Sequence, residues 1–594
     1  MPIYNAPLQD FRFLLHEYLD LEPCRGLASM AEATPDVIDA VLEEAARVSE
    51  EVLQPLNVVG DLEGCRFDDG EVKLPDGFGD AWKVYTEGGW SGLTCDPEYG
   101  GQGLPGFVGL ALSEMINSAN ASFSAYPGLT HGAYEVIHHY GTEEQKQRFL
   151  PPMVDGRWSG TMNLTEPQCG TDLGLIRTRA EPREDGTYAL HGTKIWITAG
   201  EHDLADNIVH LVLARTPDAP AGTRGISLFI VPKYRVDAEG AAGERNGVRC
   251  GSIEHKMGQN ASSTCEMIFE GAVGELIGEE NRGLACMFTM MNAARLVTGI
   301  QGLAMAVAAQ QNAAAFARER LQGRALSGAK YPDQPADPIL VHPDVRRMLL
   351  TSRALVEGCR ALGLYTGVQL ELERRHDDEM VRTEAGRWVA LMTPVIKAFF
   401  TDVGSEVANL GMQVHGGAGY VTDTGVEQFV RDVRITQIYE GTNGVQALDL
   451  VGRKLVADSG ATLKSFFDHA GGLLERTAEP ELAEFTKAFK EALDRLQQTS
   501  AWIYGQMSRD PNEAGAASAD YLRMFALTAL AFTWTGQAAA AQRKMAAGDN
   551  SSFYQAKLDT ARFFMARVLP DTIALDARIR AGAGPIMDPV DEAF

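Results

Sequence analysis

The chain has 594 residues, of which 45% are apolar and 22% charged, as in ordinary globular proteins. This length exceeds what one hydrophobic core can organise, so three or four domains are expected. The 53 Lys and Arg residues against 80 Asp and Glu give a net charge of −27, which disfavours nucleic acid and anionic membranes as partners. The eight cysteines form no CxxC pair and no metal-ligand spacing, which indicates reduced thiols.

Residues 1–157 are predicted to form an N-terminal helical domain, because apolar residues recur at helical spacing from Asp10 to about Leu150. The start of the chain has neither a basic region nor an apolar signal core, and a cytoplasmic location is expected. Glu135, His138 and His139 invite a metal interpretation. Adjacent histidines on a helix point in different directions, so no metal site is expected there.

Residues 158–280 change to short β-rich runs separated by turns, which predict a compact β domain. Residues 281–456 return to long helices and predict a helical bundle. Its most apolar stretch, Gly283 to Ala309, contains Asn292, Arg295 and Gln301, which favours a buried bundle helix over a membrane span. The insertion from Ser327 to Pro338 cannot be helical, because its prolines lack N–H donors. Residues 457–594 predict an additional small helical domain.

Glu440 is the most informative residue of the chain. It lies between Tyr439 and Gly441 at a predicted junction of a loop and a helix. Partial desolvation there raises the pKa of a carboxyl group and makes it a stronger base. An alternative is that the carboxylate only complements a helix dipole.

Upstream, Gln413 opens a glycine-rich segment whose backbone can approach a phosphate closely. Because no predicted strand precedes it, the segment is not a dinucleotide-binding fingerprint, and simple turn formation is the alternative. For Lys194–Thr198 the alternative to a binding role is a half-buried strand. For the segment around Thr165 and Thr171 it is a turn.

Taken together, in this order and at these separations, these segments closely resemble the acyl-CoA dehydrogenase family. They are Leu164–Asp172, Lys194–Thr198, Gln413–Tyr420 and Arg434–Gly444. The resemblance runs from about Trp90 to Lys454. It implies a mostly α fold with a central β domain: a helical domain, a β-barrel domain on the flavin and thioester side, and a helical bundle. It also implies an FAD cofactor and dehydrogenation of an acyl-CoA to the trans-2-enoyl-CoA.

The resemblance also assigns roles to single residues. Glu440 matches the catalytic base, and the competing base position of some relatives, immediately before Arg295, is Ala294. Substrate contacts are implied at four positions: Thr171, Arg295, Tyr439 and Gly441. Cofactor contacts are implied at eight: Thr165, Trp196, Thr198, Arg320, Gln413, Gly416, Gly417 and Thr442. The match at Arg320 is looser, because the aromatic residue and glycine that usually follow Gln322 are replaced by Gly323 and Arg324.

The additional residues 457–594, the Tyr4–Pro7 opening and the Glu254–Gly258 motif resemble a long bacterial subgroup of the family that includes an enzyme for 3-(methylthio)propanoyl-CoA, which implies a short or medium acyl-CoA substrate. The family resemblance implies an electron-transfer flavoprotein as acceptor and a glycine-rich segment and Arg320 that reach the flavin of the neighbouring subunit. A homodimer is expected, because the helices after Ala461 would cover the surface that a second dimer would occupy. Three alternatives remain open: a straight-chain medium- or long-chain acyl-CoA dehydrogenase, an acyl-CoA oxidase that passes electrons to oxygen, and a catalytically silent scaffold that kept the fold.

Overall fold

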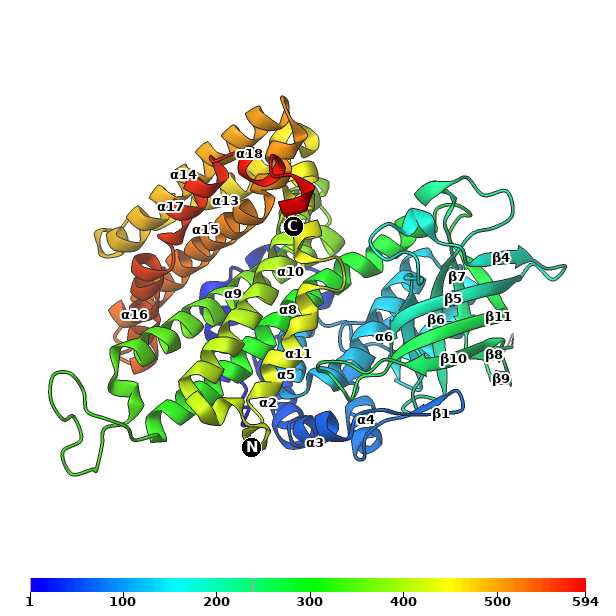
Figure 1. The fold of residues 1–594 in the computed structure, drawn as a ribbon, viewed down its shortest axis with the longest axis horizontal. Helices are drawn as coiled ribbons and strands as arrows, with labels where there is room; N and C mark the ends of the chain where they lie inside the picture. Colours follow the sequence, from blue (N-terminus) through cyan, green and yellow to red (C-terminus); the bar gives the residue numbers. More distant parts are fainter. Residues whose placement is uncertain (1, 238–239, 594) are drawn as a thin grey trace. The chain divides into compact units, whose positions relative to one another are not determined.

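The computed structural model describes residues 2–237 and 240–593. These residues form two compact units, each considered by itself below. Unit 2 comprises residues 44–105 and 115–297, and unit 1 comprises residues 1–43, 106–114 and 298–594. Long helices dominate the chain and one sheet domain lies in its middle, so the predicted fold class is confirmed (Figure 1).

Unit 2 begins with helices and a small hairpin. Its helical elements are the end of α2 (Pro35–Val48), α3 (Pro55–Glu63), α4 (Phe78–Glu87), the end of α5 (Gly106–Ala119), α6 (Ala121–Tyr140) and α7 (Glu143–Val154), and β1 (Arg66–Asp68) pairs with β2 (Glu71–Lys73). Helix α7 starts at a capping box, in which the Thr142 and Gln145 side chains each bind the backbone N–H of the other residue. The Thr–x–x–Gln spacing therefore fixes the start of this helix.

The sheet of unit 2 has seven strands. They are β3 (Trp158–Asn163), β4 (Arg179–Pro182), β5 (Tyr188–Thr198), β6 (Asn207–Ala214), β7 (Ser227–Pro232), β10 (Val248–Ile253) and β11 (Thr264–Ile277). The order is β3-β6-β7-β11-β5-β4, with β10 also paired to β11; only β3 and β6 run parallel. A separate hairpin joins β8 (Tyr234–Val236) to β9 (Ala242–Arg245). Every residue of β6 and β7 is buried, which explains their nearly continuous apolar sequences.

Unit 1 is helical. Its helices are α1 (Leu8–Phe13), the part of α8 (Gly283–Glu319) from residue 298 onward, α9 (Pro343–Arg375), α10 (Glu379–His415), α11 (Glu427–Arg434), α12 (Asn443–Asp449), α13 (Ala461–Arg476), α14 (Ala483–Met507), α15 (Pro511–Ala546), α16 (Ser552–Arg567), α17 (Asp571–Ile579) and α18 (Gly584–Met587). Helices α8 and α10 approach closely at two glycines. A Cβ atom on Gly302 would lie 2.6 Å from the Thr401 Cα, and one on Gly299 would lie 2.6 Å from the Ile396 side chain.

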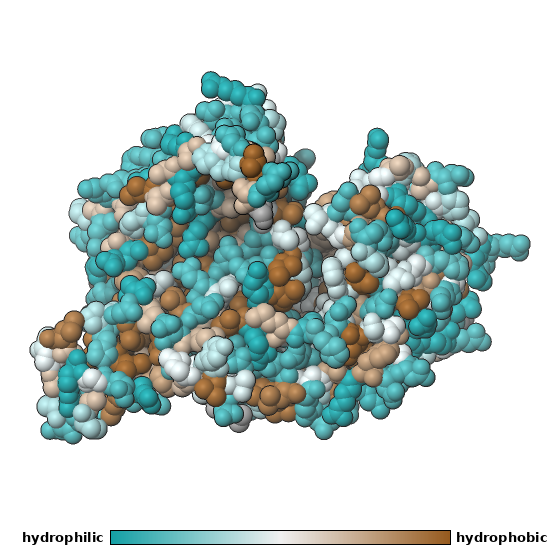
Figure 2. Space-filling model, viewed as in Figure 1, coloured by the Kyte–Doolittle hydropathy of each residue, from teal (hydrophilic) through white to brown (hydrophobic). Residues whose placement is uncertain are grey.

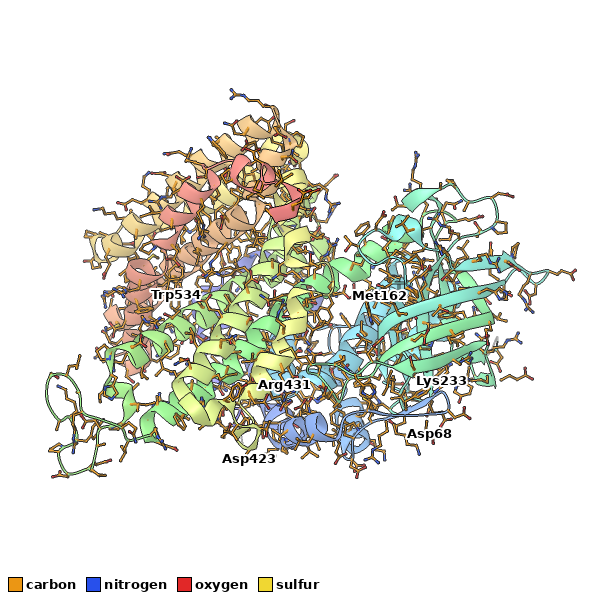
Figure 3. All side chains as sticks on the ribbon, viewed as in Figure 1. Asp68, Met162, Lys233, Asp423, Arg431 and Trp534 are labelled. Atoms are coloured by element: carbon orange, nitrogen blue, oxygen red, sulfur yellow. The ribbon has the colours of Figure 1, made fainter. Side chains whose placement is uncertain are left out.

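Helix α15 is the centre of the C-terminal bundle. It packs against α14, α16 and α17, and also against α9, α10 and α12. Trp534 is fully buried on this helix and its indole Nε1 donates to the Ala354 carbonyl at 3.0 Å (Figure 3). The additional residues 457–594 therefore share a core with the dehydrogenase-like helices.

Helix α8 is the one helix of the described residues with the length and hydropathy of a membrane span. Half of its most apolar window is buried, and the core helix of a soluble protein has the same properties, so this is weak evidence for a span. Figure 2 shows hydrophilic and hydrophobic side chains interspersed on the displayed face.

A cluster of buried charges joins the first residues of the chain to the C-terminal bundle. Arg360 on α9 binds Asp10 at 2.5 Å and Glu114 at 2.6 Å, and Lys557 on α16 binds Asp10 and, at 2.8 Å, Glu357. Burial alone raises the pKa of Asp10, but the Lys557 ammonium and the Arg360 guanidinium outweigh it and hold that pKa below its usual value. This cluster explains why residues 1–43 belong to unit 1.

Replacing Lys557 by Met should therefore destabilise unit 1 strongly, because removing one partner leaves buried carboxylates uncompensated at a cost of about 3–5 kcal/mol. The matched control is Lys490→Met, which breaks the exposed Lys490–Asp494 pair of the same bundle, worth roughly 0–1 kcal/mol. Thermal unfolding followed by circular dichroism measures both. Equal midpoints for the two variants would contradict the structural role of Lys557.

Candidate functional site

Glu440 lies in a tight turn that joins α11 to α12 within unit 1. The turn runs from Tyr439 to Thr442, and the Thr442 hydroxyl caps α12 by accepting from the Val445 N–H at 3.4 Å. Glu440 has φ of +55° and Gly441 has φ of +84°. A left-handed backbone is unfavourable for a residue with a Cβ atom, and such strain clusters at functional sites. We call residues 439–442 the Glu440 turn.

The Tyr439 side chain is also fixed. Its hydroxyl donates to the Oε1 atom of Gln301, a buried residue of α8. Glu440 itself is half-buried. The structure therefore places a half-buried glutamate beside an anchored tyrosine.

The glycine-rich segment begins where α10 ends. Gln413, Gly416 and Gly417 are exposed, and a Cβ atom on either glycine would meet nothing within 4 Å. The Phe316 and His415 rings lie 4.5 Å apart, so the ends of α8 and α10 are side by side. Arg320, which is exposed, follows α8 at this same end of unit 1. The structure thus brings the four predicted pyrophosphate-binding residues to one open end of the bundle.

In unit 2, Trp196 and Thr198 lie on β5 next to a β-bulge. The register between β5 and β11 shifts between the pairs Cys265–Ile197 and Met267–Lys194, and Trp196 has φ of +59°. A bulge redirects the side chains around it. The Trp196 side chain is 62% exposed, although its neighbours Lys194 and Ile197 are buried, so the indole presents an accessible aromatic surface.

Thr165 is held beside this strand. The Ile195 N–H donates to the Thr165 carbonyl at 3.0 Å. The buried Lys194 ammonium donates to the Leu164 carbonyl and to Glu166 Oε1, both at 2.9 Å. These bonds attach the loop of Thr165 to the strand of Trp196, so two of the predicted flavin-contacting segments are adjacent in unit 2.

Glu166 is the hub of this attachment. Its carboxylate also accepts from the Arg177 N–H at 2.6 Å and from the N–H and hydroxyl of Thr178 at 3.0 and 2.6 Å. Burial alone raises the pKa of Glu166, but Lys194 and these donors lower it to about 2. The same burial lowers the pKa of Lys194.

The two remaining predicted residues are placed less distinctively. Thr171 is exposed in the loop that precedes the turn at Leu173–Leu175. Arg295 is buried on α8 and its Nη1 atom donates to Asn292 Oδ1 at 3.3 Å. Both belong to unit 2, whereas Tyr439, Glu440, Gly441 and Thr442 belong to unit 1.

These residues fit FAD. An isoalloxazine ring requires an accessible aromatic or apolar wall and nearby hydroxyls, which Trp196, Thr198 and Thr165 provide. A pyrophosphate requires open backbone and a cation, which the glycines at 416 and 417 and Arg320 provide.

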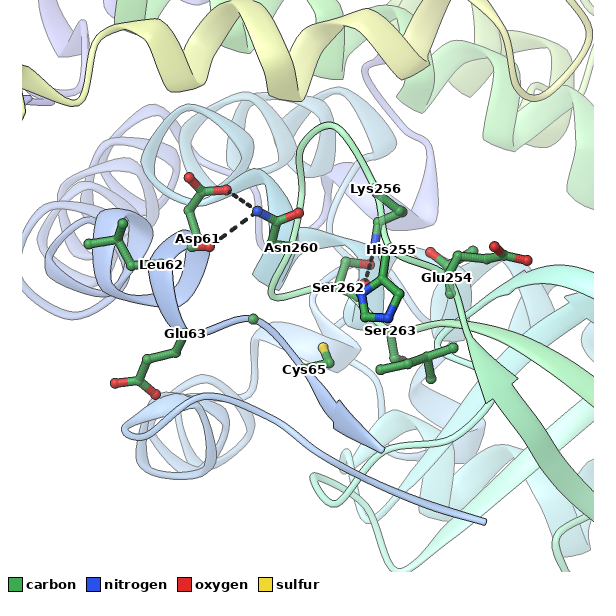
Figure 4. Close-up of a pocket in the computed structure, with 13 residues that line it drawn as sticks. Asp61, Leu62, Glu63, Cys65, Glu254, His255, Lys256, Asn260, Ser262 and Ser263 are labelled. Atoms are coloured by element: carbon green, nitrogen blue, oxygen red, sulfur yellow. Dashed lines mark hydrogen bonds between the residues drawn. The ribbon is translucent and has the colours of Figure 1, made fainter. Parts of the chain in front are cut away.

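A polar pocket of about 330 Å³ in unit 2 is not lined by the predicted site residues, although its lining residue Thr264 pairs with Thr198 (Figure 4). Its rim carries His255 and Lys256 of the Glu254–Gly258 motif. The Lys256 ammonium donates to the Ser262 carbonyl at 2.8 Å, and Asn260 binds Asp61 at 2.9 Å. The Lys256 and Asn260 side chains therefore already have hydrogen-bond partners among the residues that line the pocket.

Among the other polar candidates, His138 contacts Asp96 at 3.3 Å. Within residues 2–237 and 240–593 no group of three or more His, Cys, Asp or Glu side chains has metal-binding geometry. All eight cysteines are free thiols.

Sequence reasoning missed the residues that hold the Glu440 turn: Gln301, Asn443 and Gln446. Asn443 lies in the Arg434–Gly444 motif and Gln446 follows it by two residues, and their amides were the available signal. Gln301 had no local signal, because its contact spans 138 positions of the chain.

Comparison with known proteins places these features in a family. Family models match four consecutive segments: the acyl-CoA dehydrogenase N-terminal domain at residues 39–157, the middle domain at 161–272, the C-terminal domain at 281–455 and an acetyl-CoA dehydrogenase C-terminal-like domain at 460–589.

Similar proteins extend over the whole chain. A 3-methylmercaptopropionyl-CoA dehydrogenase of Ruegeria pomeroyi is 44% identical over 97% of this chain and 98% of its own. A broad-specificity linear acyl-CoA dehydrogenase of Mycobacterium tuberculosis is 34% identical over the full length of both. A butyryl-CoA dehydrogenase of Syntrophomonas wolfei is 32% identical over 100% of this chain and 99% of its own.

Solved structures share the fold. The Caenorhabditis elegans ACDH-11 complex with C11-CoA has a TM-score of 0.76 at 20% identity, covering 95% of this chain and 91% of its own. An acyl-CoA dehydrogenase of Bacillus anthracis complexed with FAD has a TM-score of 0.75 at 22% identity, covering 96% and 91%. The matching models and full-length relatives show that the chain belongs to the acyl-CoA dehydrogenase family and is an FAD-dependent oxidoreductase of that family.

Proposed function

We propose that this protein oxidises a short or medium acyl-CoA to its trans-2-enoyl-CoA, with Glu440 as the base that removes the α-proton. The observation that carries the proposal is the Glu440 turn, which presents a half-buried carboxylate on a strained backbone between an anchored tyrosine and a glycine. Neither a helix-dipole role nor a silent scaffold requires that strain.

The proposed site residues have separate roles in the reaction. Removal of an α-proton leaves negative charge on the thioester oxygen, and the Glu440 N–H is the proposed donor that stabilises it. Tyr439, Gly441, Thr171 and Arg295 are the proposed substrate contacts. Thr165, Trp196 and Thr198 would hold the flavin ring, and Gln413, Gly416, Gly417, Arg320 and Thr442 the rest of FAD. When bound, FAD supplies the acceptor for the β-hydride, which no side chain can provide.

The preferred substrate in this proposal is 3-(methylthio)propanoyl-CoA. The 44% identical relative is named for this thioester under its older name, whereas more distant relatives are named for butyryl-CoA and for linear acyl-CoAs in general. A thioether sulfur has nearly the shape of a methylene group, so butanoyl-CoA and pentanoyl-CoA should also react.

The electron acceptor, the oligomeric state and the cellular location are proposed on the same grounds. Electrons would pass to an electron-transfer flavoprotein, and the protein would act as a cytoplasmic homodimer in which the open glycine-rich end of one subunit serves the flavin of the other. Hydrogen peroxide formed at the rate of turnover would instead indicate an oxidase, and light scattering gives the subunit number.

Glu440→Gln should retain FAD and acyl-CoA binding while flavin reduction slows by ~10²–10⁴-fold, because the amide keeps the shape of the side chain and removes the base. Stopped-flow absorbance of the flavin measures the rate. Reduction at the wild-type rate would refute the assignment of Glu440.

Glu166→Gln should weaken FAD binding by about tenfold or more, since one partner of a buried pair is lost and each tenfold corresponds to about 1.4 kcal/mol. The Glu166 pKa of about 2 lies below its unfolded value of about 4.3, so the stability that its ionised carboxylate contributes to the folded protein should be complete above a pH of about 4.3 and should be lost as the pH falls through about 2. Titration of the apoprotein with FAD gives the affinity. The control is Glu181→Gln, at an exposed pair of the same domain. Equal affinities for both variants would remove Glu166 from the flavin site.

The substrate assignment predicts that kcat/KM, measured with an artificial electron acceptor, is highest for 3-(methylthio)propanoyl-CoA and within roughly 10–200-fold for butanoyl-CoA and pentanoyl-CoA. Palmitoyl-CoA exceeding every short substrate tenfold would reject the short-chain assignment and leave the role of Glu440 intact.

A further inference from the structure

We propose that Gln446 and Asn443 are positioning residues for the catalytic base: their side-chain amides hold the Glu440 turn in its left-handed backbone conformation. This inference rests on the proposed role of Glu440. It assigns functions to two residues of α12 that have no expected contact with substrate or cofactor.

Gln446 acts on the turn directly. Its side chain is fully buried, and its Nε2 atom donates to the carbonyls of Glu440 and Gly441, each at 3.3 Å. One amide thus holds two successive carbonyl groups on the same side of the chain. This arrangement also requires glycine at 441, because an added Cβ atom would lie 2.6 Å from Gln446 Nε2.

Asn443 fixes the turn to α10. Its Nδ2 atom donates to the Ala398 carbonyl at 3.1 Å and to Asp402 Oδ1 at 2.8 Å. Its Oδ1 atom accepts from the Lys397 ammonium at 2.9 Å, and Lys397 is fully buried. Both ends of the amide are therefore engaged, which no other side chain of similar size can reproduce.

Asp402 of α10 binds residues on both flanks of the Glu440 turn. The same Oδ1 atom that accepts from Asn443 also accepts from Gln437 Nε2 at 2.6 Å. Gln437 precedes the Glu440 turn and Asn443 follows it. One carboxylate oxygen on α10 thus binds both flanks of the turn and limits how far it can open.

The energetic requirement is specific. A left-handed backbone is unfavourable for a residue with a Cβ atom, so an unsupported Glu440 would relax to a right-handed or extended backbone. That relaxation would redirect both the carboxylate and the N–H of the residue. Displacing a reacting group by about 1 Å can cost on the order of 10²-fold in rate. The amide contacts are thus expected to act on the chemical step more than on substrate affinity.

The test uses Gln446→Glu and Asn443→Asp, each of which keeps the side-chain shape and removes the N–H donors. Flavin reduction under single turnover should slow by about 10–100-fold in both, while the dissociation constant of the acyl-CoA changes less than threefold. The second readout is the rate at which the substrate α-proton exchanges with D₂O. This rate measures proton removal by the base independently of flavin reduction, and it should fall by a similar factor. Leu448→Ala, at a half-exposed position of the same helix, is the control and should match the wild type in both readouts.

The outcomes separate this inference from the assignment of the base. If Glu440→Gln is inactive while Gln446→Glu and Asn443→Asp exchange and reduce at the wild-type rate, the two amides have no positioning role and Glu440 remains the base. If Glu440→Gln itself exchanges the proton normally, the proposed function fails. Should Gln446→Glu not fold, Gln446→Met is uncharged, equally long and lacks the donor, and the same rates apply to it.

Discussion

Left-handed backbone at residues with a Cβ atom is the constraint on which the candidate residues of each unit depend. Trp196 in unit 2 has φ of +59°, and Glu440 in unit 1 has φ of +55°. Each conformation persists only because its surroundings enforce it. At Trp196 the enforcement comes from a bulge between two long strands and from the Lys194–Glu166 pair below it. At Glu440 it comes from the amides of Gln446 and Asn443 together with the Asp402 carboxylate.

The difference between these two supports follows from their surroundings. In the loop at Glu166, the backbone N–H groups of Arg177 and Thr178 and the Lys194 ammonium all donate to one carboxylate. These hydrogen bonds replace the water that the buried ion pair has lost and offset its desolvation cost. At the Glu440 turn the donor to the backbone carbonyls of Glu440 and Gly441 is the neutral amide of Gln446. The charged groups Lys397 and Asp402 are bound to this region through the amide of Asn443.

How far the sequence predicts this protein depends on the range of the interactions concerned. The order of helical and β-rich segments and the non-helical insertion from Ser327 to Pro338 depend on local patterns, and the structure has them where the patterns indicate. The family motifs identify Glu440, Trp196 and the glycine pair as candidates, and their roles stay predictions. The contacts that shape them were not predictable. Gln301, Lys397 and Asp402 carry no motif of their own, and the bulge at Trp196 arises from pairing with a strand some seventy positions away.

The attachment of Asp10 to Lys557 has a consequence for how the chain is made. Residues 44–297, apart from a short piece of α5, contain all of unit 2 and are synthesised before residues 298–594, so this unit can fold while synthesis continues. The helix that carries Asp10 can contact Arg360 once α9 has been synthesised, but it cannot complete its native contacts until α16 follows. During that interval Phe13, whose ring packs against Phe553 and Tyr554 of α16 in the finished protein, lacks these partners. Residues 8–13 are therefore among the last parts of unit 1 to complete their packing, although they are synthesised before its other helices.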